Sequence, residues 1–309
     1  MEKKILLAVD DSVHSKNAVN YVVNMASTVK KPKFTLFHVQ PCVSQYLLEE
    51  AEKNLKAKAE LKNLIRKNGE ASQRILEKCK TQMVNMGIGE NCIEMTTQPR
   101  ILGIAKDIID RAQQGLYDAI VVGRRGLSRI QKAFMGSLAA DLVEHSKIIP
   151  VWVVDGEIKS QKIMLAIDGS ESSLKAVDHL SFMVGGNPDV KITLYHVIPR
   201  VGEYCVVDFT VKYGNMEEIV AHGARRCIED FYAVAQKKMR RAGIEEGQWN
   251  IKTVKRTANV GKAIVDEAKK EDYGTVVIGR RGTGRSFFTG SVSRFVIDNS
   301  AHKALWLVN

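Results

Sequence analysis

The chain has 309 residues, of which 45% are hydrophobic and 26% charged, and its net charge at pH 7 is +11. This composition is typical of a folded globular protein and excludes a disordered chain. Because no apolar run approaches the roughly 20 residues that cross a bilayer, and the first apolar run is too short for a signal peptide, we expect a cytoplasmic protein with no membrane partner.

The first half of the chain alternates apolar runs with amphipathic stretches. We expect strands at residues 5–9, 34–39, 92–97, 119–122 and 150–154. We expect helices at residues 18–26, 101–112 and 138–145, and a long charged helix at 45–86 that Gly69 interrupts. Strands that are apolar throughout and alternate with helices predict a parallel sheet covered on both faces.

The second half repeats the first. Residues 4–12 return as residues 162–170, and residues 35–39 return as 193–197, both at an offset of 158 positions. Helices at 216–242 and 260–268, and strands near 251, at 275–278 and at 305–308, complete the second copy. A repeat this long is a duplicated domain, because each copy can bury its own core. We therefore expect two α/β domains, at residues 1–156 and 157–309, each with five parallel strands.

Three strand ends of the first half carry candidate ligand-binding residues. Asp10, Val39 and Gly123 each lie at or just after the carboxyl end of a predicted strand. In an open parallel sheet, ligands bind beyond these ends, near the point where the strand order reverses. Asp10 is suited to accept a hydrogen bond from an adenine amino group or a ribose hydroxyl. The alternative is that Asp10 only caps the following helix, although Ser12 could cap it equally well.

A glycine-rich loop follows the fourth strand. It reads Gly123-Arg124-Arg125-Gly126, then nine residues, then Gly136-Ser137. Glycines let backbone N–H groups approach a polyphosphate, and Gly136-Ser137 opens a helix whose N-terminus favours an anion. The spacing is neither that of a P-loop nor that of a dinucleotide fingerprint. A glycine that serves only the turn is the alternative reading.

The cysteines, histidines and basic residues indicate no further kind of site. The five cysteines form no close pair and the seven histidines lack metal-ligand spacing, so we expect neither disulfides nor a metal site. We interpret His38 and His196, which repeat inside strands, as structural. Much of the basic excess lies on predicted helices such as 56–67, and aromatic residues make up only 6% of the chain, so nucleic acid is a disfavoured partner.

Four segments together resemble the universal stress protein family. They are ILLAVDDS, FHVQP, VVGRRGLSRIQKAFMGSLAADLV and PVWVV, and the resemblance extends over nearly the whole chain in both halves. It implies two tandem Rossmann-like domains of the adenine nucleotide alpha hydrolase-like type. The spacing of Gly, two residues, Gly, nine residues and Gly-Ser matches the family's ATP-binding motif. An adenine nucleotide, ATP with or without Mg²⁺, is therefore the expected ligand.

The resemblance also assigns roles to residues. Asp10 would contact adenosine, the Val39 backbone the adenine, and the loop residues Gly123, Gly126, Gly136 and Ser137 the ribose and phosphates. The corresponding residues of the second half are Asp168, Val197, Gly279, Gly282, Gly290 and Ser291. Arg124 and Arg280 would add a cationic rim that pairs with phosphate, or else face solvent as ordinary loop residues.

The second copy departs from the motif. Between Gly282 and Gly290 it has seven residues instead of nine. Two residues fewer shorten the maximum reach of an extended chain by about 7 Å. We therefore expect the second half to bind ATP more weakly than the first, or to leave its crevice empty.

The resemblance implies an ATP-binding sensor or regulator of the stress response. We expect no dedicated catalyst, because the sequence shows no paired carboxylates, no Ser-His-Asp set and no metal cluster, but slow ATP hydrolysis is an alternative. A nucleotide-free dimerisation or signalling module of the same fold is another. An ATP-activating enzyme is disfavoured, since the first strand leads to Asp10-Asp11-Ser12 and not to a Ser-Gly-Gly-x-Asp-Ser loop.

The closing strands predict how the halves associate. In this family that strand often mediates dimer pairing, and Trp152 and Trp306 occupy equivalent positions on the two strands. An apolar edge strand left unpaired is an aggregation hazard. We expect the two halves to pair as an intramolecular pseudo-dimer, and a homodimer of the chain is a further expectation.

Overall fold

The computed structural model describes the chain apart from residues 1, 126–134, 200–213, 258 and 281–289. The chain divides into two compact units. One consists of Met1–Ala26 and Lys31–Asp155, and the other of Ser27–Lys30 and Gly156–Asn309. Within the described residues, every helix is either too short or too polar to cross a bilayer.

The first unit is built on five parallel strands. They are β1 (Lys3–Ala8), β2 (Pro32–Gln40), β3 (Ile93–Pro99), β4 (Ala119–Gly123) and β5 (Val151–Val154). Their spatial order is β3-β2-β1-β4-β5, and each neighbouring pair is parallel. The central strands are apolar on both faces, as a sheet covered by helices requires, and Leu6 of β1 and Ile120 of β4 are fully buried. The predicted parallel α/β fold is confirmed.

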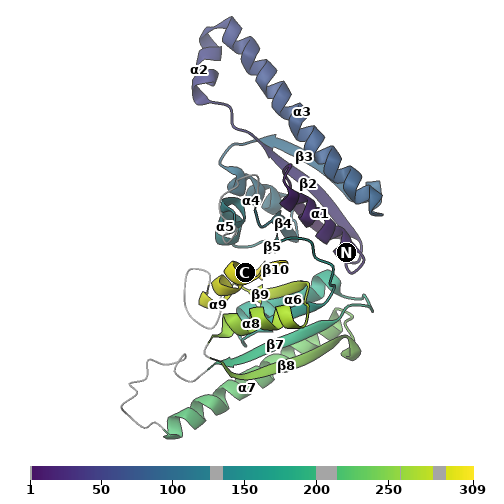
Figure 1. The fold of residues 1–309 in the computed structure, drawn as a ribbon, viewed down its shortest axis with the longest axis vertical. Coiled ribbons are helices and arrows are strands. Elements are labelled where there is room, and N and C mark those ends of the chain that lie inside the picture. The colour runs from purple at the N-terminus through teal and green to yellow at the C-terminus, as the bar shows by residue number, and fades with distance from the viewer. Residues whose placement is uncertain (1, 126–134, 200–213, 258, 281–289) are drawn as a thin grey trace. The chain divides into compact units, whose positions relative to one another are not determined.

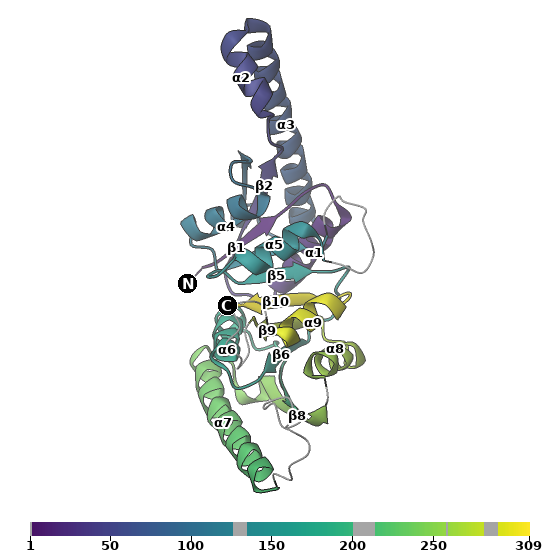
Figure 2. The ribbon, with the colours of Figure 1, turned by 90° about the vertical axis from the view of Figure 1, so that its left-hand side faces the viewer.

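Two pairs of helices cover the first sheet (Figure 1). The helices are α1 (Val13–Ala26), α2 (Gln45–Lys53), α3 (Leu55–Asn85), α4 (Ile104–Gln114) and α5 (Ser137–His145), with a 3-10 turn at Glu90–Cys92. α1 packs with α3, and α4 packs with α5 on the opposite face. α2 folds back along the first part of α3, beyond the end of the sheet (Figure 2).

The long charged region differs from the prediction, because Gly69 does not interrupt it. Gly69 lies inside α3, and apart from its own turn of the helix no atom stands within 4 Å of the place where a Cβ would be. The break is at Asn54, whose side-chain oxygen accepts hydrogen bonds from the N–H groups of Lys56 and Ala57. A side chain that caps a new helix ends the old one, whereas a single glycine inside a helix costs only about 1 kcal/mol.

The fourth helix begins three residues later than predicted. Gly103 precedes it with a φ of 133°, which only glycine adopts readily. The carboxylate of Asp107 then accepts hydrogen bonds from the N–H groups of Ile101 and Leu102. These two residues therefore form a turn held by the helix and are not part of it.

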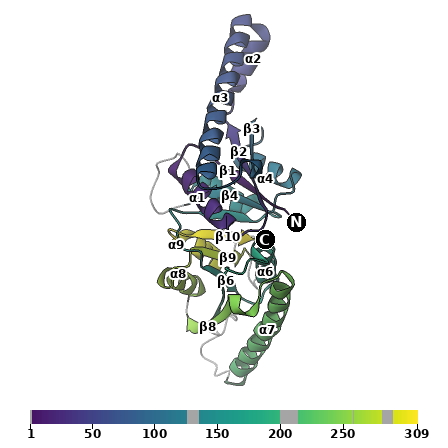
Figure 3. The same ribbon diagram turned by 90° about the vertical axis from the view of Figure 1, so that its right-hand side faces the viewer.

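The second unit repeats this architecture. Its strands are β6 (Ile163–Ile167), β7 (Ile192–Pro199), β8 (Trp249–Thr257), β9 (Thr275–Gly279) and β10 (Ala304–Val308), in the order β8-β7-β6-β9-β10. Its helices are α6 (Glu171–Val184), α7 (Gly214–Arg241), α8 (Val260–Lys270) and α9 (Ser291–Asn299). A 3-10 turn spans Glu246–Gln248. α6 and α7 cover one face of this sheet, and α8 and α9 cover the other (Figure 3).

The last residue of β4 touches the first turn of α1. A Cβ on Gly123 would lie 2.7 Å from the carbonyl carbon and oxygen of His14. The second unit has the same contact, since a Cβ on Gly279 would lie 2.7 Å from the carbonyl carbon of Ser172. Glycine at these positions is thus required by the approach of a helix to a strand, independently of any ligand.

His179 lies in the core of the second unit. Its ring meets Trp306 edge-on, with 5.6 Å between ring centroids. Burial lowers the pKa of His179 from 6.5 to about 3, so the ring is neutral in the folded protein at neutral pH.

We predict that Gly123→Ala destabilises the first unit, because the new methyl group would overlap the backbone of α1. Overpacking of this kind costs about 1–3 kcal/mol in the free energy of unfolding. Gly69→Ala is the matched control, and its open surroundings predict a gain of about 0.5–1 kcal/mol. Urea unfolding followed by circular dichroism measures both variants. A Gly123→Ala protein as stable as the wild type would contradict the close packing.

We predict that acid weakens the second unit through His179. Between the ordinary pKa of 6.5 and the folded value of about 3, the unfolded state binds a proton that the folded state does not. Stability therefore falls as the pH drops, by about 2 kcal/mol between pH 7 and pH 5. His179→Phe should flatten this dependence in urea unfolding. An unchanged pH profile in the variant would show that another group titrates.

Candidate functional site

The strand order reverses direction between β1 and β4. β1 makes its last pairings at Ala8, with Phe37 of β2 on one side and Val122 of β4 on the other. β2 continues three residues further, to Gln40. The second unit matches, because β6 ends opposite His196 while β7 runs on to Pro199. In an open parallel sheet, a ligand crevice is expected at the carboxyl ends of the strands where the strand order reverses.

The backbone of Val39 faces the space beyond β1. Phe37 accepts a hydrogen bond from the Val9 N–H, so its polar backbone groups point toward β1. Successive residues of a strand alternate in direction, and those of Val39, two positions on, point the same way past the end of β1. The Val39 side chain is buried. The side chain of Val197 is buried too, and its backbone has the corresponding place on β7.

Asp10 is held by a network of local hydrogen bonds. Its Oδ1 accepts from the Ser12 N–H at 3.1 Å and from the Ser15 Oγ at 2.6 Å, and Ser15 Oγ accepts from the Asp10 N–H at 2.8 Å. Ser12 caps α1, because its Oγ accepts from the Ser15 N–H. Among the described residues, nothing donates to Asp10 Oδ2. One carboxylate oxygen thus shapes the turn, and the described residues leave the other without a hydrogen-bond donor.

The second unit repeats the network around Asp168. Its Oδ1 accepts from the Ser170 N–H at 3.0 Å and from the Ser173 Oγ at 2.5 Å, and Ser170 caps α6. Ser15 and Ser173 were missed by the sequence analysis. A signal existed, since serines stand two and five positions after the aspartate in both copies.

The helix that follows the glycine-rich loop starts without a side-chain cap. Gly136 is the N-cap of α5 and Gly290 that of α9, and neither helix has a capping side chain. α6 and α8 differ, because Ser170 and Asn259 cap them. Uncapped N–H groups at a helix N-terminus attract anions. Ser137 and Ser291, the first residues of these two helices, are exposed.

The side chains of Arg124 and Arg280 are not exposed, which excludes the alternative that they face solvent as ordinary loop residues, and their pairing with phosphate stays a prediction. Both are buried, at 3% and 2% exposure. The Arg124 Nη1 lies 3.8 Å from the Asp155 Oδ2, and the Arg280 Nη1 donates to the Asn309 Oδ1 at 2.8 Å. Each arginine therefore fastens the loop to the residue after the last strand of its unit. Sequence spacing could not reveal this contact.

Both loops close in the same way despite their different lengths. The Gly136 N–H donates to the Arg124 carbonyl at 2.8 Å, and the Gly290 N–H donates to the Arg280 carbonyl at 3.0 Å. The ends of each loop meet, so reach does not limit the shorter one. Gly126 and Gly282 lie outside the described residues.

Cys79, His38 and His196 lie close to the ends of β1 and β6. Burial raises the pKa of the Cys79 thiol to about 11, and the nearby charges of Asp10 and Asp11 add to the rise. His38 Nδ1 lies 2.7 Å from the Val9 carbonyl oxygen, and His196 makes the same contact with Ile167 at 3.0 Å. Within the part of the chain that the structure describes, no three His, Cys, Asp or Glu side chains gather to hold a metal ion.

Comparison with solved structures shows the same fold. A universal stress protein from Archaeoglobus fulgidus DSM 4304 is similar with a TM-score of 0.65 and 18% identity, over 98% of this chain and 97% of that one. A functionally unknown protein from Pseudomonas aeruginosa PAO1 is similar with a TM-score of 0.57 and 14% identity, over 99% and 92%. A universal stress protein in complex with cAMP covers 49% of this chain, with a TM-score of 0.36.

Sequence comparison identifies the family. No curated protein matches the chain significantly. The family model described as the universal stress protein family matches twice, at residues 1–155 and 159–308. The two matches together span nearly the whole chain, so it belongs to the universal stress protein family and carries two copies of the family's domain.

Proposed function

We propose that the first half binds ATP and that the protein acts as a cytoplasmic sensor or regulator of the stress response. The observation that carries the proposal is the convergence of three features at one edge of the sheet. They are the available Oδ2 of Asp10, the outward-facing backbone of Val39 and the uncapped N-terminus of α5. An adenine nucleotide has a chemical group that can bind to each of these three features.

Each feature suits one part of the nucleotide. Asp10 Oδ2 can accept from a ribose hydroxyl or an adenine amino group. The Val39 N–H and carbonyl can pair with the edge of the adenine ring. The first N–H groups of α5, with the Ser137 hydroxyl and the loop glycines Gly123, Gly126 and Gly136, suit the phosphates and any Mg²⁺ bound to them.

We propose a second, weaker site in the second half. Asp168, Val197 and the α9 N-terminus repeat the arrangement of the first half. The sequence also repeats the glycine-rich loop, with Gly279, Gly282, Gly290 and Ser291. Its loop has two residues fewer with which to surround the phosphates, which supports weaker binding.

Binding without efficient turnover is the role that these groups support. Among the described residues, the side chain that hydrogen bonds with Asp10 is the Ser15 hydroxyl and not a second carboxylate, which supports binding without a paired acid and base. Slow hydrolysis with Mg²⁺ is the alternative for the same site. A nucleotide-free signalling module is the alternative for a half that binds nothing.

We predict a dissociation constant near 1 μM for ATP at the first site, about −8 kcal/mol. Gly136→Val should weaken binding at least about tenfold, because a branched side chain would stand beside the N–H groups of α5. The backbone of Gly136, at a φ of −62°, suits any residue, so the fold should persist. Gly290→Val is the matched variant of the second half. Titration calorimetry of the full chain measures both affinity and stoichiometry.

The stoichiometry separates the two halves. We expect one strong site, which Gly136→Val removes, and one weaker site, which Gly290→Val removes. Two equal sites would show that the shorter loop costs nothing. No binding at millimolar ATP would rule the proposal out, and release of phosphate faster than once per hour would favour the hydrolase alternative.

We also propose that the two halves pair through their closing strands, as the sequence predicts, and that the chain dimerises. Residues 1–156 and 157–309, produced separately, should form a complex when mixed. Analytical ultracentrifugation of each half, of the mixture and of the full chain measures this. Halves that stay monomeric alone and mixed would exclude the pairing.

A further inference from the structure

The turn between β3 and α4 lies at the carboxyl end of β2. β3 pairs with β2 up to Pro99, which is opposite Gln40. α4 begins at Ile104 and packs on β2 and β4, on the face of the sheet opposite α1 and α3. Residues 100–103 therefore cross from β3 over the end of β2, where Val39 lies.

This turn holds two apolar side chains in solvent. Ile101 is 75% exposed and Leu102 is 62% exposed. Their N–H groups each donate at 2.9 Å to a carboxylate oxygen of Asp107, which is itself buried. Burying a carboxylate is costly unless hydrogen bonds compensate it. A buried charge thus fixes a turn whose side chains add little to the core, which packing alone does not explain.

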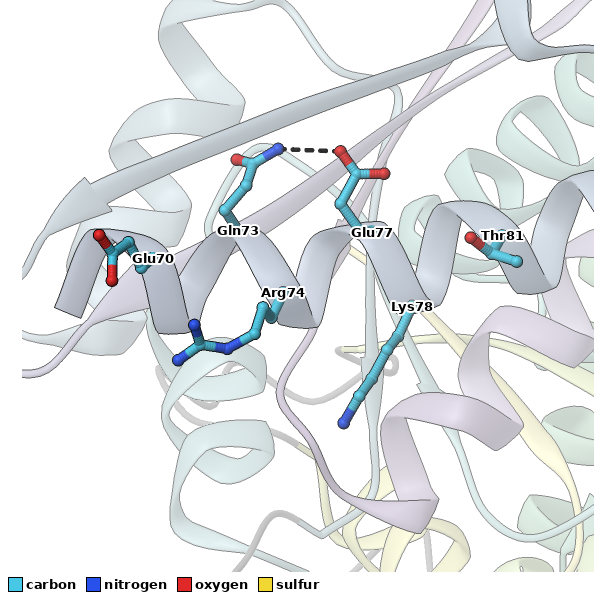
Figure 4. A pocket seen from close by; sticks show the side chains of 6 residues that line it. All are labelled: Glu70, Gln73, Arg74, Glu77, Lys78 and Thr81. Atoms are coloured by element: carbon cyan, nitrogen blue, oxygen red, sulfur yellow. Dashed lines mark hydrogen bonds between the residues drawn. The ribbon is translucent and has the colours of Figure 1, made fainter. Parts of the chain in front are cut away.

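The α3 side of the candidate site offers polar groups instead. A hollow of about 680 Å³ along α3 is lined by Glu70, Gln73, Arg74, Glu77, Lys78 and Thr81 (Figure 4). Lys78 Nζ lies 3.0 Å from the Oδ1 of Asp11, the residue next to Asp10, so the hollow borders the aspartate turn. None of the six lining residues is aliphatic or aromatic. Apolar contact for a flat ring is therefore found at the turn on the α4 side and not in this hollow.

The second half lacks the apolar turn. α8 begins 156 positions after α4. At this offset, the second half has Thr257 and Ala258 where the first has the apolar pair, and Ala263 where the first has Asp107. The Asn259 side chain caps α8 instead. The difference gives only the first half a pair of large aliphatic side chains at this place.

We propose that Ile101 and Leu102 cover one face of the adenine ring in the first half, while the Val39 backbone pairs with the edge of the ring. The inference rests on the proposed nucleotide function and adds residues that recognise the base. Ligand sites commonly combine a few polar groups that fix orientation with apolar side chains that bury most of the surface. The phosphates, at the α5 N-terminus, gain nothing from this pair.

The test compares ATP with inorganic tripolyphosphate on the full chain carrying Gly290→Val, so that only the first site is measured. The double change Ile101→Ala with Leu102→Ala should lower ATP affinity about tenfold, because apolar contact with the ring is lost, and leave tripolyphosphate affinity unchanged. Leu116→Ala with Ile148→Ala is the matched control. These residues are 78% and 71% exposed and lie before the amino ends of β4 and β5, at the other edge of the sheet.

Methyl NMR of the full chain gives a direct second measurement. A methyl group over the face of an aromatic ring is shifted upfield by the ring current. ATP should therefore shift the Ile101 and Leu102 methyl signals upfield, and tripolyphosphate should not. The single Ala variants assign the two signals.

The outcomes separate this inference from the proposed function. ATP affinity that is unchanged in the double variant, or lost equally in the control, would overturn the role of Ile101 and Leu102 while leaving nucleotide binding in place. Methyl signals that ATP does not shift upfield would overturn it too. A parent protein that binds neither ATP nor tripolyphosphate would overturn both this inference and the proposed function.

Discussion

The close approach between the end of β4 and the first turn of α1 is the constraint on which the candidate site depends. Gly123 leaves no room for a side chain against the His14 backbone, so the helix starts directly over the strand end. The turn that carries Asp10 and the loop that begins at Arg124 therefore share one edge of the sheet. The second unit keeps this arrangement with Gly279 and Ser172. Any ligand at this edge uses a geometry that packing has already set.

The two halves share a backbone design and differ in the side chains around it. Both aspartate turns use the same serine network, and both loops are closed by the same hydrogen bond. The differences lie in the side chains that pack beside these turns and loops. Ser293 donates to the Gly279 carbonyl at 2.9 Å, where the first half has Ala139. Duplication followed by change in the surrounding layer thus keeps one backbone geometry in two different side-chain environments.

The sequence predicted the fold and the placement of the strand ends well, because both follow from patterns that repeat. Apolar runs located the strands within two residues or so, and the offset of the repeat revealed the two copies. The break at Asn54 was missed because a cap depends on one hydrogen bond that no periodicity reveals. The burial of Arg124 was missed because its partner, Asp155, is 31 positions away in the sequence and adjacent only after folding.

The continuity of α3 past Gly69 has a mechanical consequence. A helix rises about 1.5 Å per residue, so the part of α3 between Lys78 and its first residue, Leu55, is roughly 35 Å long. α2 is packed against the far end of this rod. A tilt of about 5° at Lys78 would displace that end by about 3 Å, which makes the helix a lever arm that amplifies small movements beside the crevice.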